Sequence, residues 1–538
     1  MKHTGNPRSL NRILPVFLLA FIPMTVLSQQ EPRGDRAMAD LYAVWAKNTI
    51  EQGFWSEALA ALERANDFAT VSSDISWLLA LARSHANMPR GTVLEALNMA
   101  LAVDRWVLYY PESARLMRAE NLIAIRAYAD ALLELSHVSR GPKEASLTLQ
   151  ALASWRPAEF RRLMWETLDR YPRDSEPVRL FFRFISNNDA AGLYPASDDL
   201  ELLELIRRRL PILLLDDPDL AWIAAPYIRD TAEARRMLSA YRAVNNPAPE
   251  SLPIALKLGV IDEDTALREL FDFSRERYWR GNTMDIALLE EIWDLLEGED
   301  SKALFRRNLA AYSGVITEDA DRDGFPETFA QYDRGWLRQC DYDTDQDGAP
   351  VLTVFFEGGV PYRGLALIPP ESGFSSRKNA AIRWERYPAV LETELDGARF
   401  IPRPLDFHFS PVLFVDLWGS GVLFPRSDPM TAPLTRRTLV YWALRVERPS
   451  LEFRGGIEVV ELNQGIPVRA REYVGDLMVA ETEFLRGRPQ VQWVDLDFNG
   501  RMDTARHFSR VYRSVELEDL WNYDRVFDYT VDNPEVWQ

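Results

Sequence analysis

The spacing of hydrophobic residues changes once along the chain, near residue 313. Before that point, apolar residues recur every three or four positions, which is the spacing that lines one face of an α-helix. After it, apolar and polar residues alternate over short runs such as 351–356 and 360–367, as in half-buried β-strands. These patterns predict an α+β multidomain protein with an all-α N-terminal region and an antiparallel β-rich C-terminal domain.

The helical half repeats a short motif. The pattern G-x-x-x-E-A-L begins at Gly53 and again at Gly91, and a looser copy, A-Y-A-D-A-L, begins at Ala127. Each copy follows a stretch with helical apolar spacing, at 41–52, 75–87 and 113–125. Because the copies are 38 and then 35 residues apart, counted between their central alanines, they predict repeated helix pairs.

This repeat resembles the tetratricopeptide repeat (TPR), a helix pair of about 34 residues. The matching positions are the small residues Ala46, Ala58 and Ala65 and the glycine before the second helix, Gly53. Trp77 fits the first helix of the family pattern, but no Leu-Gly follows it. The resemblance implies that residues 36–140 stack into a superhelix whose concave face binds a partner protein or peptide. An irregular helical bundle is the alternative.

Residues 141–312 continue the helical pattern less regularly, as a further helical repeat or superhelix region. We expect its helices at 145–154, 157–171, 176–186, 198–210, 231–244, 251–258, 263–275 and 284–296.

The β-rich domain is expected to span residues 313–515 as an antiparallel meander. Two similar turns, F-E-G-G-V-P from Phe356 and L-N-Q-G-I-P from Leu462, lie 106 residues apart. The proline-rich stretch 369–433 is predicted to be mixed, with short strands at 407–409 and 413–415. The acidic, aromatic tail at 516–538 is expected to pack back as a short helix.

Two loops in this half share the spacing D-x-D-x-[DN]-G-x-x-[DE], at 319–327 and 495–503. Positions 1, 3 and 5 place three side-chain oxygens inside a tight turn, the glycine at position 6 permits the backbone reversal, and the acid at position 9 closes the ring. Without a cation, each close pair of carboxylates repels by roughly 1–4 kcal/mol. The pattern therefore predicts structural Ca²⁺ sites with these candidate ligands: Asp319, Asp321, Asp323, Glu327, Asp495, Asp497, Asn499 and Asp503.

A middle copy at 341–348 adds Asp343, Asp345 and Asp347 as candidate ligands. Its match is weaker, because the ninth position counted from Asp343 is Val351. Asp341 could replace the missing ligand, or the loop could bind nothing. All three copies also fit Asp- and Gly-rich turns without a metal, since both residues favour turns.

These loops are not EF-hands, because their twelfth positions are Ala330 and Arg506 instead of glutamate, and their flanks have strand patterns. The loop at 495–503 resembles the short calcium loops of the FG-GAP and VCBS repeat families. The resemblance covers about ten residues per loop. The F-G-x-x-G-A-P element and a regular blade repeat are missing, so it does not imply a propeller.

Residues 1–28 have the pattern of a secretory signal peptide. A basic segment precedes the apolar stretch 13–27, and a cut is expected near Ser28. The apolar stretch is short for a membrane span and contains Pro15 and Pro23. We expect a periplasmic or secreted protein, with a retained N-terminal anchor as the alternative.

Charge and composition exclude several classes of partner and of active site. The net charge of −19 disfavours nucleic acid and anionic membrane surfaces as partners. The single cysteine, Cys340, cannot form an intramolecular disulfide or a cysteine zinc cluster. The sequence carries no P-loop, G-x-S-x-G, G-x-G-x-x-G or H-E-x-x-H motif, and it predicts no catalytic or cofactor-binding residue apart from the calcium ligands.

The leading interpretation is an exported TPR-like scaffold with a calcium-stabilised β-domain. One alternative is a cell-envelope enzyme acting on glycan through acids and tryptophans of the β-domain. Another is a calcium-dependent adhesive or carbohydrate-binding module. Tryptophans that could stack on sugar rings, although core packing is their commoner role, are Trp336, Trp384, Trp418, Trp442 and Trp493. The oligomeric state stays open.

Overall fold

The structure is a computed structural model, and it describes residues 36–68, 72–86, 88–103, 106–190, 197–244, 247–273, 283–368, 378–403, 406–509, 520–523 and 525–532. The predicted signal peptide, 1–28, lies outside these residues. In the described ranges, no helix has both the length and the apolar character needed to cross a membrane. The chain divides into two compact units, Met1–Arg118 and Ala119–Gln538.

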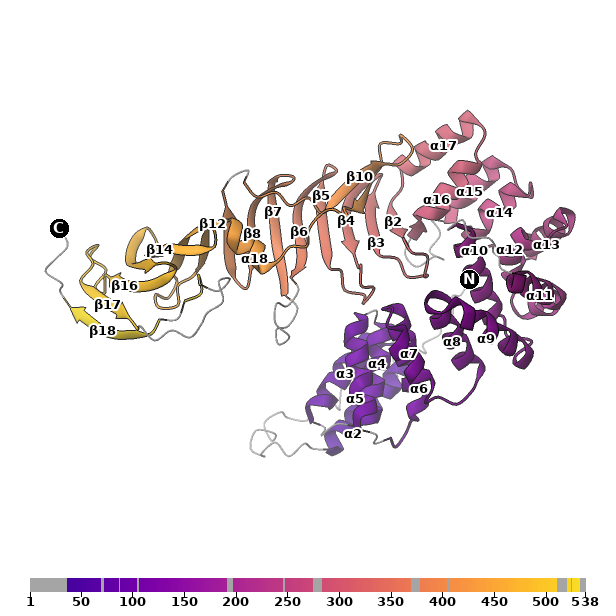
Figure 1. The fold of residues 1–538 in the computed structure, drawn as a ribbon, viewed down its shortest axis with the longest axis horizontal. Helices are drawn as coiled ribbons and strands as arrows, with labels where there is room; N and C mark the ends of the chain where they lie inside the picture. The colour runs from indigo at the N-terminus through magenta and orange to yellow at the C-terminus, as the bar shows by residue number, and fades with distance from the viewer. Residues whose placement is uncertain are drawn as a thin grey trace, which may run out of the picture. The chain divides into compact units, whose positions relative to one another are not determined.

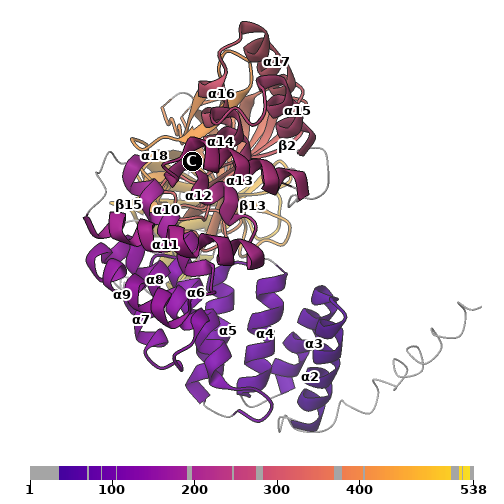
Figure 2. The ribbon, with the colours of Figure 1, turned by 90° about the vertical axis from the view of Figure 1, so that its right-hand side faces the viewer.

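The helix pairs predicted from the repeat are present. In the first unit, α2 packs against α3 and α4 against α5, and Figure 2 shows these four helices side by side. The next two helices, α6 and α7, follow in the same order at the third copy of the motif. Their bounds are α2 (Arg36–Glu51), α3 (Trp55–Phe68), α4 (Ser73–His85), α5 (Arg90–Val103), α6 (Pro111–Ala124) and α7 (Tyr128–Leu135).

Small residues allow the paired helices to approach closely. Ala46, Ala58, Ala65 and Ala96 are completely buried in the core of the first unit, as the TPR-like pattern predicts. Gly53 adopts φ +80° directly after α2, a conformation that costs glycine little and that commonly ends a helix before a turn. The repeat therefore specifies both the contact surface and the turn of each pair.

The second unit continues with helices before its sheet. They are α8 (Pro142–Trp155), α9 (Pro157–Arg170), α10 (Glu176–Ala190), α11 (Ser197–Asp216), α12 (Leu220–Ala224), α13 (Thr231–Val244), α14 (Leu252–Lys257), α15 (Glu263–Phe273), α16 (Ile286–Leu295) and α17 (Glu299–Ala310), with 3₁₀ turns η2 (Ala225–Tyr227) and η3 (Pro249–Ser251). Two of these helices, α12 and α17, were not predicted. The buried face of α17 consists of only Phe305 and Leu309, so its sequence has little apolar periodicity.

The β-rich domain is built on one 16-stranded sheet, so the predicted fold class is confirmed (Figure 1). Its strands follow chain order: β1 (Thr283–Asp285), β2 (Gly314–Glu318), β3 (Thr328–Asp333), β4 (Trp336–Tyr342), β5 (Leu352–Glu357), β6 (Val360–Ile368), β7 (Lys378–Arg386), β8 (Ala389–Leu395), β9 (Ala398–Pro402), β12 (Ala443–Pro449), β13 (Ile457–Asn463), β14 (Ile466–Val474), β15 (Leu477–Leu485), β16 (Arg488–Val494), β17 (Thr504–Phe508) and β18 (Phe527–Asp532). A separate hairpin, β10 (Val412–Asp416) with β11 (Leu423–Ser427), and one helix, α18 (Arg436–Trp442), interrupt the order.

Three predictions about strands and helices were wrong. The chain forms a strand at 283–285, where a helix was expected to begin, because these residues pair in parallel with β2. The stretch 369–433 contains the long strands β7 and β8, whereas 407–409 contributes only an isolated bridge from His408 to Ala389. In the described part of the tail, 520–523 and 525–532, the chain forms the strand β18 and no helix. The partners of β1 and β18 lie about 20–30 residues away in the sequence, so local patterns do not reveal these two strands.

Tight turns close four hairpins at one edge of the sheet. In each turn both central residues have positive φ, as type I′ turns require: Arg334-Gly335, Gly358-Gly359, Gln464-Gly465 and Arg486-Gly487. The two similar turns of the sequence, at Gly358-Gly359 and Gln464-Gly465, are therefore two of these four. The acidic loops lie at the opposite edge of the sheet, where the other ends of the strands are connected.

One hydrophobic core joins α14–α17 to the sheet. Leu289 and Phe305 from the helices belong to the same buried cluster as Ile316 and Val354 from the strands. Trp293, Phe305 and Trp418 stack or meet edge to face within it, with ring centroids 5.2–5.7 Å apart. These last helices therefore form a single folded body with the first strands of the sheet.

Candidate metal-binding loops

The three acidic loops occupy equivalent places in the sheet. Each is a nine-residue connection between neighbouring antiparallel strands: loop 1 (319–327) joins β2 to β3, loop 2 (343–351) joins β4 to β5, and loop 3 (495–503) joins β16 to β17. Strands β2, β4 and β16 run in the same direction, because every pair of neighbours between them is antiparallel and an even number of steps separates them. All three loops therefore lie at the same edge.

The loops also share one backbone conformation. Positions 4 and 6 have positive φ in every copy: Arg322 (61°) and Gly324 (96°), Gln346 (54°) and Gly348 (84°), Phe498 (60°) and Gly500 (86°). A non-glycine residue at positive φ is uncommon, so its recurrence at position 4 shows that the surrounding bonds impose it.

The first aspartate of each loop organises these bonds. In loop 3, the Asp495 carboxylate accepts the backbone N–H groups of Asn499 (3.1 Å) and Gly500 (2.7 Å). The same two bonds recur in loop 1, from Asp323 (3.1 Å) and Gly324 (2.8 Å) to Asp319, and in loop 2, from Asp347 (3.1 Å) and Gly348 (2.7 Å) to Asp343. This bonding leaves each loop folded around its own carboxylates.

Three carboxylates converge in each loop. In loop 1 the residues are Asp319, Asp321 and Glu327; in loop 2, Asp343, Asp345 and Asp347; in loop 3, Asp495, Asp497 and Asp503. Within each triad, one oxygen from every residue lies within 4.8 Å of the others. A hard divalent cation with oxygen ligands fits such a donor set.

The two predicted ligands at position 5, Asp323 and Asn499, each accept a hydrogen bond from the backbone of their own loop. Asp323 accepts the N–H group of Phe325, and Asn499 accepts that of Arg501, both at 2.8 Å. Asp341, the suggested substitute in loop 2, lies outside the triad, and its carboxylate accepts the Thr353 hydroxyl at 2.7 Å.

Burial and mutual repulsion disfavour the charged carboxylates. Burial first, and then the charges of Asp323, Asp321 and Glu327, raise the pKa of Asp319 to about 6. Burial and the neighbouring Asp347 and Asp345 likewise raise the pKa of Asp343 to about 6. A bound cation would reverse this preference, because it stabilises the ionised form.

Loop 1 contacts a cationic side chain that sequence spacing did not reveal. Arg126, in the turn between α6 and α7, forms ion pairs with Asp321, with Glu327 (2.8 Å) and with Asp323 (3.6 Å). Nearby, the Asn187 side chain donates to the Arg322 carbonyl at 3.1 Å. Arg126 and Glu327 are 201 residues apart, and Asn187 and Arg322 are 135 apart, so only the folded chain brings them together.

Loop 2 also reaches loop 1. The Gln346 side-chain amide donates to the Phe325 carbonyl (2.8 Å), to Glu327 (3.2 Å) and to Asp323 (3.3 Å). By contrast, no lysine or arginine in the described part of the chain forms an ion pair with the loop 3 triad. The three loops thus share a backbone and differ in their surroundings.

The other side chains considered in the sequence, the cysteine and the tryptophans of the β-domain, divide into buried and exposed residues. Cys340 is completely buried in β4, and burial raises the pKa of its thiol, so the unreactive protonated form is favoured. Trp384 is buried and donates to the Phe409 carbonyl at 3.1 Å. Trp336 and Trp442 are exposed.

No family model matches the chain. A Treponema pallidum (strain Nichols) protein described as uncharacterized is 23% identical over 603 residues, which cover 90% of this chain and 75% of that protein.

Several solved structures are similar to the helical part. A tetratricopeptide repeat protein from Parabacteroides merdae ATCC 43184 is 9% identical, with a TM-score of 0.33. The superposition covers 51% of this chain and 99% of that protein. MamA from Desulfovibrio magneticus RS-1 is 16% identical, with a TM-score of 0.29, over 34% of this chain and 98% of MamA. The pilF protein of Pseudomonas aeruginosa is 14% identical, with a TM-score of 0.27, over 50% of this chain and 98% of pilF.

Proposed function

We propose that this protein is an exported scaffold, periplasmic or secreted, whose helical repeats bind a partner protein or peptide and whose β-domain is stabilised by calcium. The single observation that carries the binding function is an exposed apolar stripe on α2. Leu41, Val44 and Trp45 are 60%, 53% and 51% exposed. Their i, i+3, i+4 spacing places them on one face of the helix, while Ala39 and Ala46 are buried.

An exposed apolar stripe of this kind favours a partner with its own apolar anchors. Contiguous apolar surface is rare on monomeric soluble proteins and commonly marks an interaction site. Tryptophan is enriched among the residues that contribute most to binding energy. An amphipathic helix or an apolar peptide segment would cover the stripe without burying unpaired charge.

The test is photocrosslinking in cells from a reactive residue placed at position 45 of the full chain. A specific crosslinked protein is expected, and the triple variant Leu41→Ser/Val44→Ser/Trp45→Ser should lose it with little change in melting temperature. The matched control is Leu133→Ser/Leu215→Ser/Val244→Ser, which removes exposed apolar residues from three other helices. Equal loss in both variants, or no specific crosslink, would refute the proposal.

Calcium is the proposed ligand of the acidic loops, in the manner of the FG-GAP and VCBS loops that they resemble. The shared backbone and the convergence of three carboxylates in each loop support this assignment. A structural role fits best, because each triad lies in a loop that links two neighbouring strands of the sheet. A metal that binds only the folded state stabilises it by mass action.

A carbohydrate-binding module is the second candidate function, because Trp336 is exposed at a hairpin turn and could stack on a sugar ring. Glycan binding that disappears on chelation and in Trp336→Ala would favour it. The buried acids Glu458 and Glu472 do not favour a glycan-cleaving enzyme. Arg448 pairs with Glu458 (2.7 Å) and Arg525 with Glu472 (2.8 Å), as in a structural network.

A further inference from the structure

The two ends of the 16-stranded sheet differ in how they are covered. The first strand, β1, has three residues and leads directly into α16, whose Ile286, Leu289 and Ile292 belong to the large core. The last strand, β18, has six residues and pairs only with β17 in the described part of the chain. Native proteins usually shorten, charge or cover an edge strand, because its backbone groups otherwise pair with another chain. The C-terminal edge is therefore the open end of the sheet.

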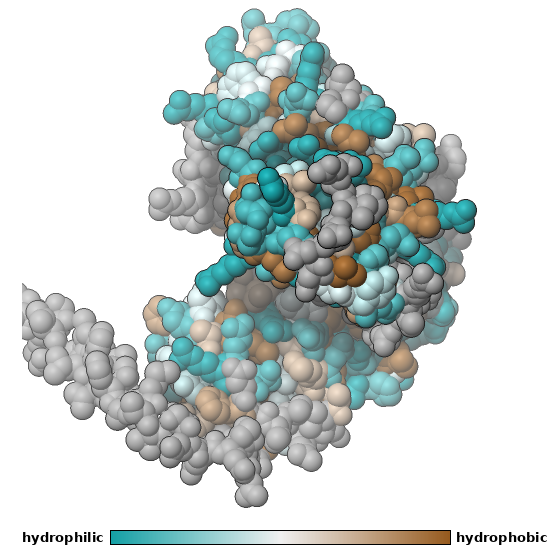
Figure 3. Space-filling model, turned by 90° about the vertical axis from the view of Figure 1, so that its left-hand side faces the viewer, coloured by the Kyte–Doolittle hydropathy of each residue, from teal (hydrophilic) through white to brown (hydrophobic). Residues whose placement is uncertain are grey.

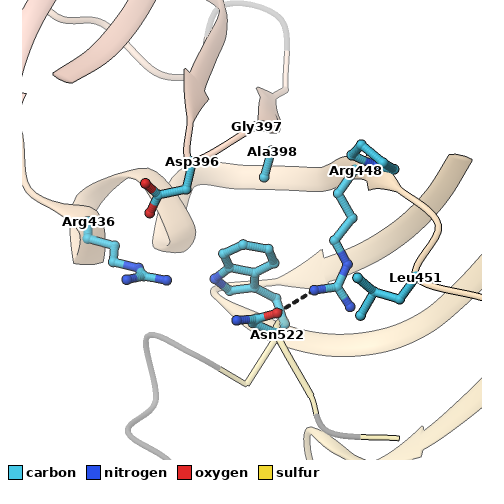
Figure 4. Close-up of a pocket in the computed structure, with 9 residues that line it drawn as sticks. Asp396, Gly397, Ala398, Arg436, Arg448, Leu451 and Asn522 are labelled. Carbon is cyan, nitrogen blue, oxygen red and sulfur yellow. Dashed lines mark hydrogen bonds between the residues drawn. The ribbon is translucent and has the colours of Figure 1, made fainter. Parts of the chain in front are cut away.

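Buried side chains that precede β18 fix this edge strand to the sheet. Trp521 is 4% exposed and belongs to the large core. Figure 4 shows Asn522 beside Arg448, which donates a hydrogen bond to the Asn522 side-chain oxygen. The Arg525 guanidinium pairs with the buried Glu472 at 2.8 Å. These contacts hold β18 beside β17 in addition to the backbone ladder between the two strands.

The side chains of β18 suit a partner strand. Tyr529 and Val531 are 57% and 40% exposed. They lie on one face of the sheet, because they pair with His507 and Ala505 of β17, whereas Thr530 lies on the other face. The strand contains neither the lysine nor the proline that commonly protect an edge. A partner strand would therefore cover apolar side chains and pair with the backbone at the same time.

We propose that β18 pairs antiparallel with β18 of a second copy of this chain, so that the two sheets become one. The register is centred on Thr530, which lies opposite the partner's Thr530, while Tyr529 lies opposite the partner's Val531. Thr–Thr pairs and aromatic pairs with β-branched residues both stabilise antiparallel strands. A register centred on Tyr529 would set Val531 opposite the partner's Phe527, which the bulge at Asp528 places on the other face.

A two-fold axis makes this edge complementary to itself. Antiparallel strands pair in this way, and two-fold dimers are the commonest oligomers. The contact is small, because β18 has six residues, whereas stable interfaces use about 20–30 residues on each side. Each end of the pairing also brings Asp528 towards the partner's Asp532. We therefore expect a weak dimer, with a dissociation constant on the order of 0.1 mM.

Cysteine crosslinking tests the register, because the single native cysteine, Cys340, is completely buried. In Thr530→Cys the two thiols lie opposite each other, at a Cα separation of about 4.5–5.5 Å that a disulfide can span. With copper–phenanthroline as oxidant, this variant should crosslink about tenfold faster than Tyr529→Cys or Val531→Cys alone, whose equivalent positions lie roughly 7–8 Å apart. A mixture of Tyr529→Cys and Val531→Cys should crosslink about as fast as Thr530→Cys, because the two positions face each other in the mixed dimer.

Sedimentation of the full chain tests the dimer itself. The unaltered chain should change from monomer to dimer between about 0.01 and 1 mM. Tyr529→Lys/Val531→Lys should stay monomeric, because lysine protects an edge from pairing. The matched control is Val360→Lys/Tyr362→Lys on the interior strand β6, where the two residues have the same spacing and are 54% and 45% exposed. This control should dimerise as the unaltered chain does, and melting curves should show that all variants are folded.

Three results would overturn the proposal. The first is an unaltered chain that is still monomeric at about 1 mM, ten times the expected dissociation constant. The second is dimerisation that Tyr529→Lys/Val531→Lys leaves unchanged. The third is equal crosslinking at positions 529, 530 and 531, or crosslinking of Thr530→Cys in cells to a different protein without any crosslink between copies.

Discussion

Loops 1 and 3 are the same local structure in two different environments. They share the spacing D-x-D-x-[DN]-G-x-x-[DE], the positive φ values at positions 4 and 6, and the paired bonds to the first aspartate. Loop 1 contacts Arg126 and Gln346, which together reach three of its acids. Loop 3 has no such basic partner among the described residues.

This difference teaches that the loop sequence determines the backbone, while the rest of the fold determines how the charge is compensated. In loop 1, a guanidinium already offsets part of the repulsion, so a calcium ion must compete with Arg126 for the same oxygens. In loop 3, the repulsion remains, so a calcium ion removes more unfavourable energy. We therefore expect loop 3 to bind calcium more tightly than loop 1.

The two loops also lie at different places along the sheet. Loop 1 lies beside the helices that share the large core, whereas loop 3 precedes β17, the neighbour of the edge strand β18. Figure 3 views the molecule from the side on which the C-terminal strands lie, and brown hydrophobic patches interrupt its polar surface. Val526, Tyr529 and Val531, around the edge strand, are exposed. A metal that fixes the hairpin of β16 and β17 would therefore stabilise the less protected end of the sheet.

The largest expected effect is that of Asp495→Ala. The substitution removes the acceptor of two backbone N–H groups, which lowers the free energy of unfolding by about 2–3 kcal/mol even in chelator. In calcium at a hundredfold excess over its dissociation constant, about 2.7 kcal/mol more should be lost with the metal. Urea unfolding with and without chelator measures both losses. The control is Asp476→Ala, an exposed aspartate in the turn between β14 and β15, which should change neither.

The next effect is a gain of calcium affinity at loop 1 in Arg126→Ala. Removing partly exposed ion pairs of roughly 0.5–1 kcal/mol each should raise the affinity of loop 1 about tenfold. Calorimetry in an Asp343→Ala/Asp495→Ala background isolates this loop. Arg140→Ala, an exposed arginine without such contacts, is the control. Unchanged affinity in Arg126→Ala would break the proposed competition.

A smaller effect concerns pH in the absence of metal. The folded-state pKa of Asp319, about 6, lies above its unfolded value near 4, so the folded state holds the proton more strongly. The resulting stabilisation is complete below about pH 4 and is lost as the pH rises through 6. Asp319→Asn removes this titration, so the difference in melting temperature between the variant and the unaltered chain should shift in favour of the variant between pH 4 and pH 7. At pH 4 the variant should be the less stable of the two, because its amide nitrogen cannot accept one of the two backbone N–H groups that bond to Asp319. Calcium should abolish the relative gain at pH 7, and a constant difference across this range would contradict the assignment.

The smallest effect distinguishes two glycines at position 6. Gly324→Ala and Gly500→Ala should each cost about 1 kcal/mol, because both residues have positive φ. The added Cβ at Gly324 would lie 3.1 Å from Arg183 Nη1, whereas at Gly500 the nearest atom is Leu477 Cδ1 at 3.9 Å. Gly324→Ala should therefore be the more destabilising of the two in thermal unfolding.

Local signals predicted much of this architecture. The motif at Gly53 and Gly91 located the helix pairs, and the change of period near residue 313 located the start of the antiparallel part of the sheet, where β2 begins at Gly314. The acidic spacing also predicted the three carboxylates that converge in each of loops 1 and 3, although it included Asp323, which lies outside the loop 1 triad. These features depend on residues close together in the chain.

Long-range features could not be predicted in the same way. The ion pairs of Arg126 with loop 1, the pairing that makes residues 527–532 a strand, and the approach of Trp521 to Arg448 all join distant segments. Nothing in the local composition around Arg126 or Trp521 distinguishes them from ordinary surface or core residues. Their roles arise only when the fold brings their partners together.

The most direct measurement is calorimetric titration of calcium into the full chain, repeated with Asp495→Ala and with magnesium in place of calcium. We expect saturable binding with a dissociation constant of about 0.1–1 mM, loss of the tightest site in Asp495→Ala, and weaker binding of magnesium. If 10 mM calcium, about ten times that range, gives neither saturable heat nor a rise in melting temperature, the acidic loops are hairpin turns that do not bind metal.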